Sequence, residues 1–193
     1  MHVAREPLDA AESDAAIEDD VVLLDDQRRP VGHIPKSAVH HADTPFHLAF
    51  SCYLFDAEGR LLLTRRALSK RTWPGVWTNS CCGHPGRGEP IEDAMRRRCE
   101  QELDLRIEHV RCVLPDFAYR LPDPTGVWEN EFCPVFTARV HPDSRLRPDP
   151  VEVIEYAWID WSTAVRSMKA IPFLFSPWAV LQVEQLAPLL GPG

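Results

Sequence analysis

Two apolar runs separated by a short polar turn stand out in residues 47–67, HLAFSCYLFDAEGRLLLTRRA. The turn, Asp56 to Gly59, contains the acidic residues and the glycine that are typical of a tight connection between strands. Apolar runs of this length on both sides of such a turn predict a β-hairpin. The chain is therefore expected to build a β-sheet around this segment, and its other elements have to pack against that sheet.

Residues 90–105, PIEDAMRRRCEQELDL, have the period of an amphipathic helix. Apolar side chains recur every four residues and make one stripe, formed by Ile91, Met95, Cys99 and Leu103. Pro90 stands near the expected first turn, where acidic side chains also favour the helix dipole: Glu89, Glu92 and Asp93. We expect a helix that buries this stripe.

Weaker patterns predict the remaining elements. Two short strands joined by a polar turn are expected within residues 20–36, and further strands over 111–121, 128–140 and 153–160. Helices are expected over 161–169 and 176–190, the second with Ser176 as its candidate N-cap and Pro177 at its first position. Because hairpins outnumber crossovers, we predict a mixed β-sheet sandwiched by helices, in an α/β or α+β fold.

Length and charge restrict the kind of protein. The 193 residues suit one domain, expected over 19–193, after an acidic segment, 1–18, that is expected to be disordered. A net charge of -8 argues against nucleic acid or an anionic membrane as a partner. No apolar run approaches the ~20 residues that span a bilayer, and no secretory signal is recognisable. We expect a cytoplasmic protein, and a monomer because heptads are lacking.

The six cysteines do not predict a disulfide framework, because the chain is neither short nor evidently secreted. Four of them lie among apolar residues and are expected to be small buried side chains: Cys52, Cys99, Cys112 and Cys133. Cys81 and Cys82 are adjacent within TNSCCGHPGRGEP, residues 78–90. In an extended segment their side chains point to opposite faces, so one of them is expected to enter a pocket, and His84 returns to that side.

A set of carboxylates and imidazoles suggests a metal site. Glu129 and Glu131 are two residues apart on a predicted strand, so they share a face, where they repel each other unless a cation or proton lies between them. A solvated strand face is the alternative. Imidazoles are supplied by His40, His41, His47 and His84, and imidazole with carboxylate suits zinc, manganese or iron.

The segment GHPGRGEPIEDAMRRRCEQEL, residues 83–103, has the spacing of a Nudix box. Gly83, Glu89, Arg97 and Glu102 fit that pattern. The box expects glutamates where this chain has Arg98 and Gln101, and a glycine where it has Asp104. A Nudix hydrolase needs those carboxylates to hold the magnesium ions that activate water. The chain therefore retains the scaffold and has lost most of the hydrolytic site.

Five motifs together resemble the type I isopentenyl-diphosphate isomerases, a family with a Nudix-like fold. They are HADTPFHLAFS, TRRALSKRTWPGVWTNSCCGHP, the degenerate box, YRLPDPTGVWENEFCPVF and FSPW, and the resemblance extends from about residue 21 to 186. A plain Nudix protein would match only the box. The resemblance implies a soluble enzyme that converts isopentenyl diphosphate into dimethylallyl diphosphate, with magnesium and a second divalent metal as cofactors.

Matched residue by residue, the resemblance implies four sets of site residues. The catalytic groups are Cys82, Glu131, Tyr119 and Trp178. The diphosphate contacts are Lys36, Arg66, Lys70 and Arg98. The ligands of a Mn²⁺ or Zn²⁺ ion are His40, His47, His84, Glu129 and Glu131. The ligands of a Mg²⁺ ion are Glu102 and the backbone carbonyl of Cys82.

The implied reaction moves a double bond through a tertiary carbocation, without redox change. An alkene is a weak base, so the reaction needs a strong acid and the exclusion of water. An indole face such as that of Trp178 can stabilise the cation, although a core aromatic is the simpler alternative. Two other functions stay open at this stage: a Nudix-type diphosphate hydrolase, and a non-catalytic module that binds a nucleotide or a metal.

Overall fold

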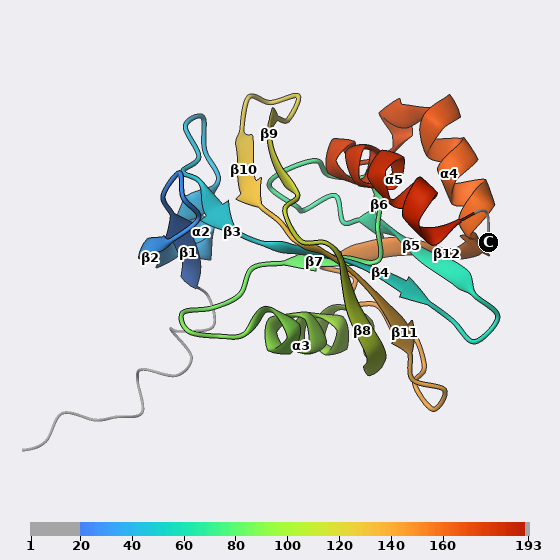
Figure 1. Ribbon diagram of the computed structural model, residues 1–193. Helices are drawn as coiled ribbons and strands as arrows, with labels where there is room; N and C mark the ends of the chain where they lie inside the picture. Colours follow the sequence, from blue (N-terminus) through green and yellow to red (C-terminus); the bar gives the residue numbers. More distant parts are fainter. Residues whose placement is uncertain (1–19, 192–193) are drawn as a thin grey trace, which may run out of the picture.

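A computed structural model describes residues 20–191 of the chain (Figure 1). The segment predicted to be disordered, residues 1–18, lies outside the described residues. The described residues form two β-sheets and a set of helices. The predicted mixed α/β class is confirmed, although the sequence predicted one sheet where the structure has two. No helix within them is long and apolar enough to cross a membrane.

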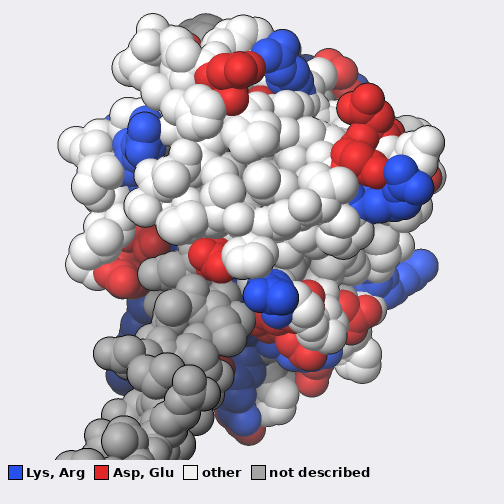
Figure 2. Space-filling view, turned by 90° about the vertical axis from the view of Figure 1, so that its left-hand side faces the viewer, with Lys and Arg blue, Asp and Glu red and all other residues white. Residues whose placement is uncertain are grey.

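The smaller sheet has five strands in the order β2-β1-β3-β10-β9. Their bounds are β1 (Asp20–Leu24), β2 (Pro30–Pro35), β3 (His47–Leu48), β9 (Ala118–Pro122) and β10 (Trp128–Phe132). The predicted pair of strands within residues 20–36 is confirmed, and a short helix, α2 (Lys36–Val39), follows it. Figure 2 views the molecule from this end. The middle of that face is mostly uncharged, with basic and acidic side chains interspersed around it.

The larger sheet has the strand order β12-β5-β4-β11-β8, with β6 paired to β5 and β7 paired to β4. Its strands are β4 (Phe50–Phe55), β5 (Arg60–Arg66), β6 (Trp77–Thr78), β7 (Cys81–Gly83), β8 (Ile107–Leu114), β11 (Val135–Val140) and β12 (Val153–Asp160). The central pair, β4 and β11, is parallel, whereas β12 and β5 are antiparallel. The sheet is therefore mixed.

The predicted hairpin opens into a fork. Strands β4 and β5 pair with each other only next to the turn, at Phe55 and Leu61. Beyond that point the segment 77–83 fills the gap: β7 pairs with β4, and β6 pairs with β5. The Ser80 hydroxyl closes the fork, since it accepts a hydrogen bond from the Leu54 amide at 2.8 Å and donates one to the Leu62 carbonyl at 2.6 Å. The two adjacent cysteines are thus built into the centre of the sheet.

Two predicted strands are each divided in the structure. Residues 111–121 lie in β8 and β9, and residues 128–140 lie in β10 and β11. The divisions fall at Pro115 and Pro134, which have no backbone N–H to donate to a strand ladder. At both points the chain passes from one sheet to the other, so the two sheets share one continuous hairpin.

Helices cover both faces of the larger sheet, with α3 on one side and α4 and α5 on the other (Figure 1). Their bounds are α3 (Ile91–Leu103), α4 (Trp161–Ala170) and α5 (Pro177–Leu190), with a 3₁₀ turn at Pro172–Leu174. Strand β4 is buried on both faces: Phe50, Cys52 and Leu54 pack in the core with α3, and Tyr53 packs in the core with α4 and α5. This two-sided burial explains its continuous apolar sequence.

Local details agree with most of the predictions. In α3 the residues Met95, Cys99 and Leu103 are fully buried, and Ile91 is half-buried. Asp104, which replaces the glycine of the box, ends this helix in the left-handed conformation, with φ 57°. Its backbone N–H bonds the Glu100 carbonyl at 2.9 Å. The substitution therefore affects helix termination.

Two expectations need correction. Cys112 was expected to be buried, but it is exposed because β8 is the edge strand of its sheet. Ser176 does occupy the N-cap position of α5, but its side chain makes no capping hydrogen bond. Its hydroxyl instead lies 2.7 Å from the Thr78 hydroxyl, because Ser176 is fully buried against the segment that fills the fork.

Candidate active site

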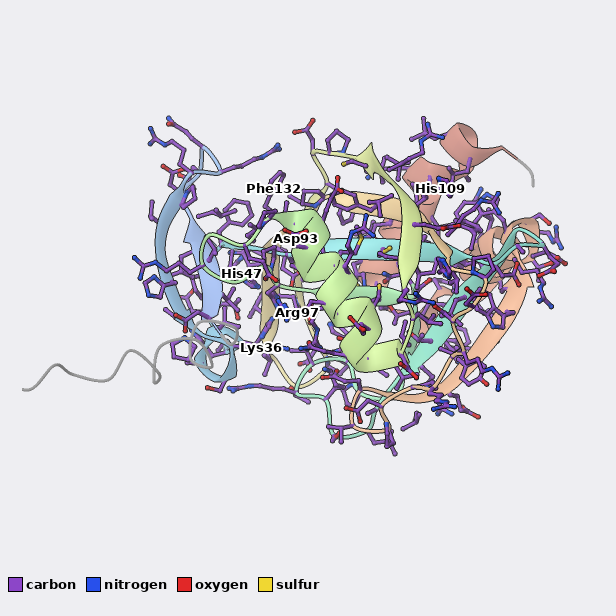
Figure 3. All side chains as sticks on the ribbon, turned by 90° about the horizontal axis from the view of Figure 1, so that it is seen from below. Lys36, His47, Asp93, Arg97, His109 and Phe132 are labelled. Atoms are coloured by element: carbon purple, nitrogen blue, oxygen red, sulfur yellow. The ribbon has the colours of Figure 1, made fainter. Side chains whose placement is uncertain are left out.

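A pocket of about 880 Å³ opens between the two sheets and α3. Its walls include every site residue that the resemblance implied except His47, which is fully buried behind the wall and touches Glu131. His41, the other imidazole that the sequence suggested, is exposed and does not line the pocket. This volume is typical of a site for a small molecule. In Figure 3, which shows the molecule from the side of α3, the labels of Lys36 and His47 both lie on the side of that helix nearer the N-terminal strands. Residues far apart in the sequence thus meet around one space.

The adjacent cysteines point in opposite directions, as the alternation of a strand requires. Cys81 packs in the core with α3, and its Sγ lies 3.8 Å from Glu102 Oε2. Cys82 faces the pocket, where its Sγ lies 3.2 Å from Asn79 Oδ1 and 3.3 Å from Ser51 Oγ. Burial raises the pKa of the Cys82 thiol to about 12. The residue is therefore a thiol that holds its proton.

Three imidazoles converge on Glu131. The Nε2 atoms of His84, His47 and His40 lie 3.2, 3.5 and 3.9 Å from Glu131 Oε1. The ligand atoms of these four residues all lie within 4.8 Å of one another. They come from four places in the chain: the end of α2, β3, the loop after β7, and β10. Such convergence of nitrogen and oxygen donors is typical of a transition-metal site.

The hydrogen bonding of these imidazoles also suits a metal. The Nε2 atoms of His40 and His47 are buried without a hydrogen-bond partner. His47 Nδ1 donates to the Pro45 carbonyl at 2.8 Å, so Nε2 is the nitrogen that faces Glu131 and could bind a metal. Burial lowers the pKa of His84 to about 3, so its ring is neutral, the form that binds metals. The residues present therefore fit a divalent ion.

Glu129 does not belong to this four-residue group but lies beside it. The Tyr119 hydroxyl oxygen lies 2.6 Å from Glu129 Oε2 and 2.9 Å from Glu131 Oε2, so its one proton is shared between the two carboxylates. Burial alone would raise the pKa of Glu131, but the imidazoles of His40, His47 and His84 beside it lower that pKa well below its usual range. Glu131 is therefore ionised in this setting. Burial and the two carboxylates raise the pKa of Tyr119 well above its usual value.

Cations and carboxylates alternate at the other end of the pocket. Arg98 forms ion pairs with Glu102 and, at 3.2 Å, with Glu152, and Lys70 forms an ion pair with the same Glu152. Lys36 lies close enough for burial and the charges of Arg98 and Lys70 to lower its pKa. Glu102 is 7% exposed, and burial raises its pKa against the opposing effect of Arg98.

The two predicted magnesium ligands share a neighbour. Cys81 Sγ lies 3.9 Å from the Cys82 carbonyl oxygen and 3.8 Å from Glu102 Oε2. Two oxygen donors beside the cationic end of a pocket suit a hard cation that also binds a phosphate. Arg98 occupies the first glutamate position that differs from the Nudix box, and it faces the pocket, so a cation stands where a hydrolase would place a metal ligand.

Trp178, at the start of α5, is 2% exposed and forms one wall. Its ring stacks on that of Tyr119 with 6.0 Å between centroids, and its Nε1 lies 3.1 Å from Asn79 Oδ1. The Arg66 guanidinium lies 5.4 Å from the ring centroid and donates to the Thr72 carbonyl at 2.8 Å. Trp178 thus connects the thiol side of the pocket with the Tyr119 side.

Among the pocket residues that were not singled out from the sequence, Asn79 and Glu152 contact the candidate site residues directly. Asn79 stands three residues before Cys82, within the quoted segment 78–90. Its nearness to Cys82 in the sequence could therefore have marked it as a candidate site residue. Glu152 lies just before β12, and nothing in its local sequence distinguishes it from other surface glutamates. Only the fold brings it to Lys70 and Arg98.

Comparisons with known proteins identify the family. The NUDIX domain family matches residues 45–179. An isopentenyl-diphosphate Delta-isomerase of Frankia alni is 58% identical over 86% of this chain and 85% of its own, and one of Mycolicibacterium vanbaalenii is 54% identical over 86% and 90%.

Solved structures share the fold at much lower identity. A MutT NUDIX hydrolase from Burkholderia pseudomallei has a TM-score of 0.54 and 22% identity, over 74% of this chain and 98% of its own. That likeness concerns the fold alone, whereas the isomerases match across nearly the whole chain. The chain therefore has a NUDIX domain and belongs to the isopentenyl-diphosphate Delta-isomerase family.

Proposed function

We propose that the pocket converts isopentenyl diphosphate into dimethylallyl diphosphate with the residues named above. The reaction adds a proton to the terminal methylene of the substrate and removes one from the CH₂ group that lies between the branched carbon and the carbon bearing the diphosphate. Atoms and charge therefore balance without a redox cofactor. It needs one proton donor and one proton acceptor at the same hydrocarbon chain.

One observation carries this proposal: Trp178 connects two different proton-carrying groups. The ring stacks on Tyr119, whose hydroxyl binds Glu131, and the ring nitrogen shares Asn79 with the Cys82 thiol. Mere binding of a diphosphate needs neither a buried thiol nor a buried tyrosine between two carboxylates. The arrangement suits a hydrocarbon that gains a proton from one group and loses one to the other.

Each group has a state that suits its role. Cys82 is protonated, because burial raises the pKa of its thiol, and Glu131 is ionised with the Tyr119 hydroxyl bonded to it. The passing tertiary carbocation needs an electron-rich wall that does not react, and the Trp178 ring provides it. Cation–π attraction contributes up to ~2 kcal/mol in a site without water.

The polar end of the substrate is assigned to the cationic end of the pocket. The diphosphate is proposed to bind four cationic side chains: Lys36, Arg66, Lys70 and Arg98. It would replace Glu152 and Glu102 as the anionic partner of these side chains. A diphosphate held there leaves its hydrocarbon chain to extend toward Cys82 and Trp178.

Two divalent ions are proposed cofactors. His40, His47, His84, Glu129 and Glu131 would hold a Mn²⁺ or Zn²⁺ ion, and Glu102 with the Cys82 carbonyl would hold Mg²⁺. When bound, the first supplies Lewis acidity beside Glu131 and the second neutralises phosphate charge.

The test uses the whole protein, isopentenyl diphosphate and Mg²⁺ in D₂O, followed by proton NMR. We expect dimethylallyl diphosphate with solvent deuterium in a methyl group, because the added proton comes from an exchangeable donor. Release of inorganic phosphate would identify a hydrolase instead, and an unchanged substrate that still binds would identify a binding module.

A further inference from the structure

We propose that Asn79 is a positioning residue, whose single side-chain oxygen holds the Cys82 thiol and the Trp178 indole together on the wall of the pocket. This inference rests on the proposed function, since it concerns two of the groups assigned to the reaction. Asn79 is fully buried between β6 and β7, at the centre of the fork in the larger sheet. It does not itself touch the carbon that gains or loses a proton.

The orientation of the Asn79 amide is determined by the backbone. Its Nδ2 donates to the Cys52 carbonyl at 3.1 Å and to the Cys81 carbonyl at 3.0 Å. A flipped amide would place its oxygen against both carbonyl oxygens and leave all of them without a donor. Oδ1 must therefore point to the opposite side, which is the side of Cys82 and Trp178.

Three donors surround this oxygen, which has two lone pairs. Cys82 Sγ lies at 3.2 Å, Trp178 Nε1 at 3.1 Å and Thr78 Oγ1 at 2.9 Å. Thr78 has a second acceptor, because its hydroxyl lies 2.7 Å from Ser176 Oγ. The indole N–H has no other hydrogen-bond partner among the described contacts, so the oxygen serves the indole and the thiol.

The Cys82 thiol also has a fixed neighbour on the side away from Asn79, the Ser51 hydroxyl. Gln182 donates to Ser51 Oγ at 2.9 Å, and Tyr53 donates to Gln182 Oε1 at 2.9 Å, so the Ser51 hydroxyl has one acceptor position already used. Ser51 Oγ lies 3.3 Å from Cys82 Sγ. The thiol therefore lies between the acceptor oxygen of Asn79 and a hydroxyl that is itself fixed by a buried chain of hydrogen bonds.

The consequence concerns the geometry of both groups relative to each other. One oxygen bonded to the thiol and to the indole keeps the proton donor and the proposed cation-stabilising ring at a constant separation. A misplacement of about 1 Å in such a constellation costs roughly 100-fold in rate. The hydrogen bond also draws electron density into the indole ring, which strengthens its attraction for a cation.

A purely structural role for Asn79 makes a different prediction. In that case the important contacts are the two bonds from Nδ2, which tie β4 to β7 through the Cys52 and Cys81 carbonyls. Asn79→Asp keeps an acceptor oxygen in the same place and loses the amide donors, whereas Asn79→Leu has a similar shape and loses both. The two variants therefore separate the roles.

We expect Asn79→Leu to lower kcat roughly 100-fold, with KM changed less than about threefold because the diphosphate contacts lie elsewhere. Asn79→Asp should restore kcat to within about tenfold of the wild type. Burial keeps its carboxyl protonated, so one oxygen still accepts from the thiol and the indole, and the O–H replaces one of the two donor bonds. Equal losses of kcat in the two variants, or a Leu variant with wild-type kcat, would overturn the proposal. Circular dichroism checks that both fold, and Asn79→Ala replaces the Leu variant if that one does not.

A second measurement does not depend on activity. The chain has six tryptophans, and the indole signal of Trp178 in a ¹H–¹⁵N spectrum can be assigned by its absence in Trp178→Phe. Loss of the hydrogen bond in Asn79→Leu should move that signal upfield and leave the other indole signals in place, while Asn79→Asp should keep it downfield. An unmoved Trp178 signal in the Leu variant refutes the proposal.

The two experiments also separate this inference from the proposed function. A wild-type protein without isomerase activity refutes the function, and the indole spectra still decide whether Asn79 holds Trp178. An active wild type with equal kcat losses in the Asp and Leu variants refutes only the positioning role.

Discussion

The two ends of the pocket satisfy their polar groups in opposite ways. At the imidazole end, His40 and His47 have buried Nε2 atoms without a hydrogen-bond partner, and both face Glu131. At the cation end, Arg98 and Lys70 already form ion pairs with carboxylates, above all with Glu152, which bridges them.

The difference follows from what it costs to bury each kind of group. A neutral imidazole loses little when one lone pair is left free, whereas an unpaired guanidinium or ammonium group loses its hydration and gains nothing in return. The imidazole end can therefore exist ready for a cation. The cation end must carry its own counter-charges, and a diphosphate has to displace them.

The largest expected effect comes from the residue between the two ends. Cys82→Ala removes the thiol that faces the pocket, and we expect it to lower kcat by roughly 10³-fold or more, as for the loss of a proton donor. Cys81→Ala should retain most of kcat, because Cys81 faces the core and the Glu102 side. Steady-state kinetics on both variants measures this, and similar losses with unchanged circular dichroism would contradict the assignment.

The second prediction tests whether the imidazole end binds a metal ion. Elemental analysis of protein purified without added metal should find about one transition-metal ion per chain. The double variant His40→Ala/His84→Ala should contain almost none, because it removes two of the three converging nitrogens.

His41→Ala is the matched control for that experiment. His41 is the neighbour of His40 in sequence, but it is exposed and its Nδ1 accepts a hydrogen bond from the Asp43 amide at 3.1 Å. This variant should keep the metal of the wild type. An undiminished metal content in the double variant would show that the ion binds elsewhere.

The third prediction concerns the cation end. Arg98→Ala removes a proposed diphosphate contact and leaves Glu102 and Glu152 without one of their partners, and both changes oppose the binding of an anion. We expect KM to rise roughly 10- to 100-fold, the range for a charge-assisted hydrogen bond. Arg97→Ala is the control, because Arg97 pairs with Glu89 at 2.7 Å outside the pocket. An equal change in KM for both variants would contradict the assignment.

The sequence predicts the imidazole end better than the cation end, and for a physical reason. The side-chain alternation of a strand relates Glu129 to Glu131 and Cys82 to His84, so short spacings revealed which side chains share a face. The amphipathic period of α3 likewise revealed its buried stripe. Such local rules operate within one element.

What the sequence did not reveal depends on contacts between elements. Glu152 reaches Lys70 and Arg98 only because β12 pairs with β5 beside α3. The fork that holds Asn79 forms because β6 and β7 insert between β4 and β5, which the hairpin pattern did not indicate. Cys112 has an apolar neighbourhood in sequence but lies on an edge strand. Long-range pairing determines all three.

The smallest expected effect comes from Glu152, the carboxylate that neutralises the cations at the cation end. Burial alone would raise the pKa of Glu152, but Lys70, Arg98 and Lys36 lower it to about 2, below the ordinary 4.5. A carboxyl with a depressed pKa contributes stability that is fully present above about pH 4.5 and is lost as the pH falls through about 2. Glu152→Gln should therefore lower the free energy of unfolding by about 1 kcal/mol at pH 7, a figure that allows for solvent screening.

Urea denaturation at pH 7, 4 and 3 measures how that difference changes. The difference in the free energy of unfolding between wild type and Glu152→Gln should narrow toward acid pH. Glu152 of the unfolded wild-type chain gains its proton in this range, whereas in the folded protein it stays ionised to lower pH. Glu155→Gln is the control, since Glu155 pairs with Arg65 through a side chain that is 54% exposed, and an exposed pair contributes little at any pH. A gap that stays constant across the three pH values would mean that Glu152 acts through its shape and not its charge, and that the cation end does not depend on an internal counter-ion.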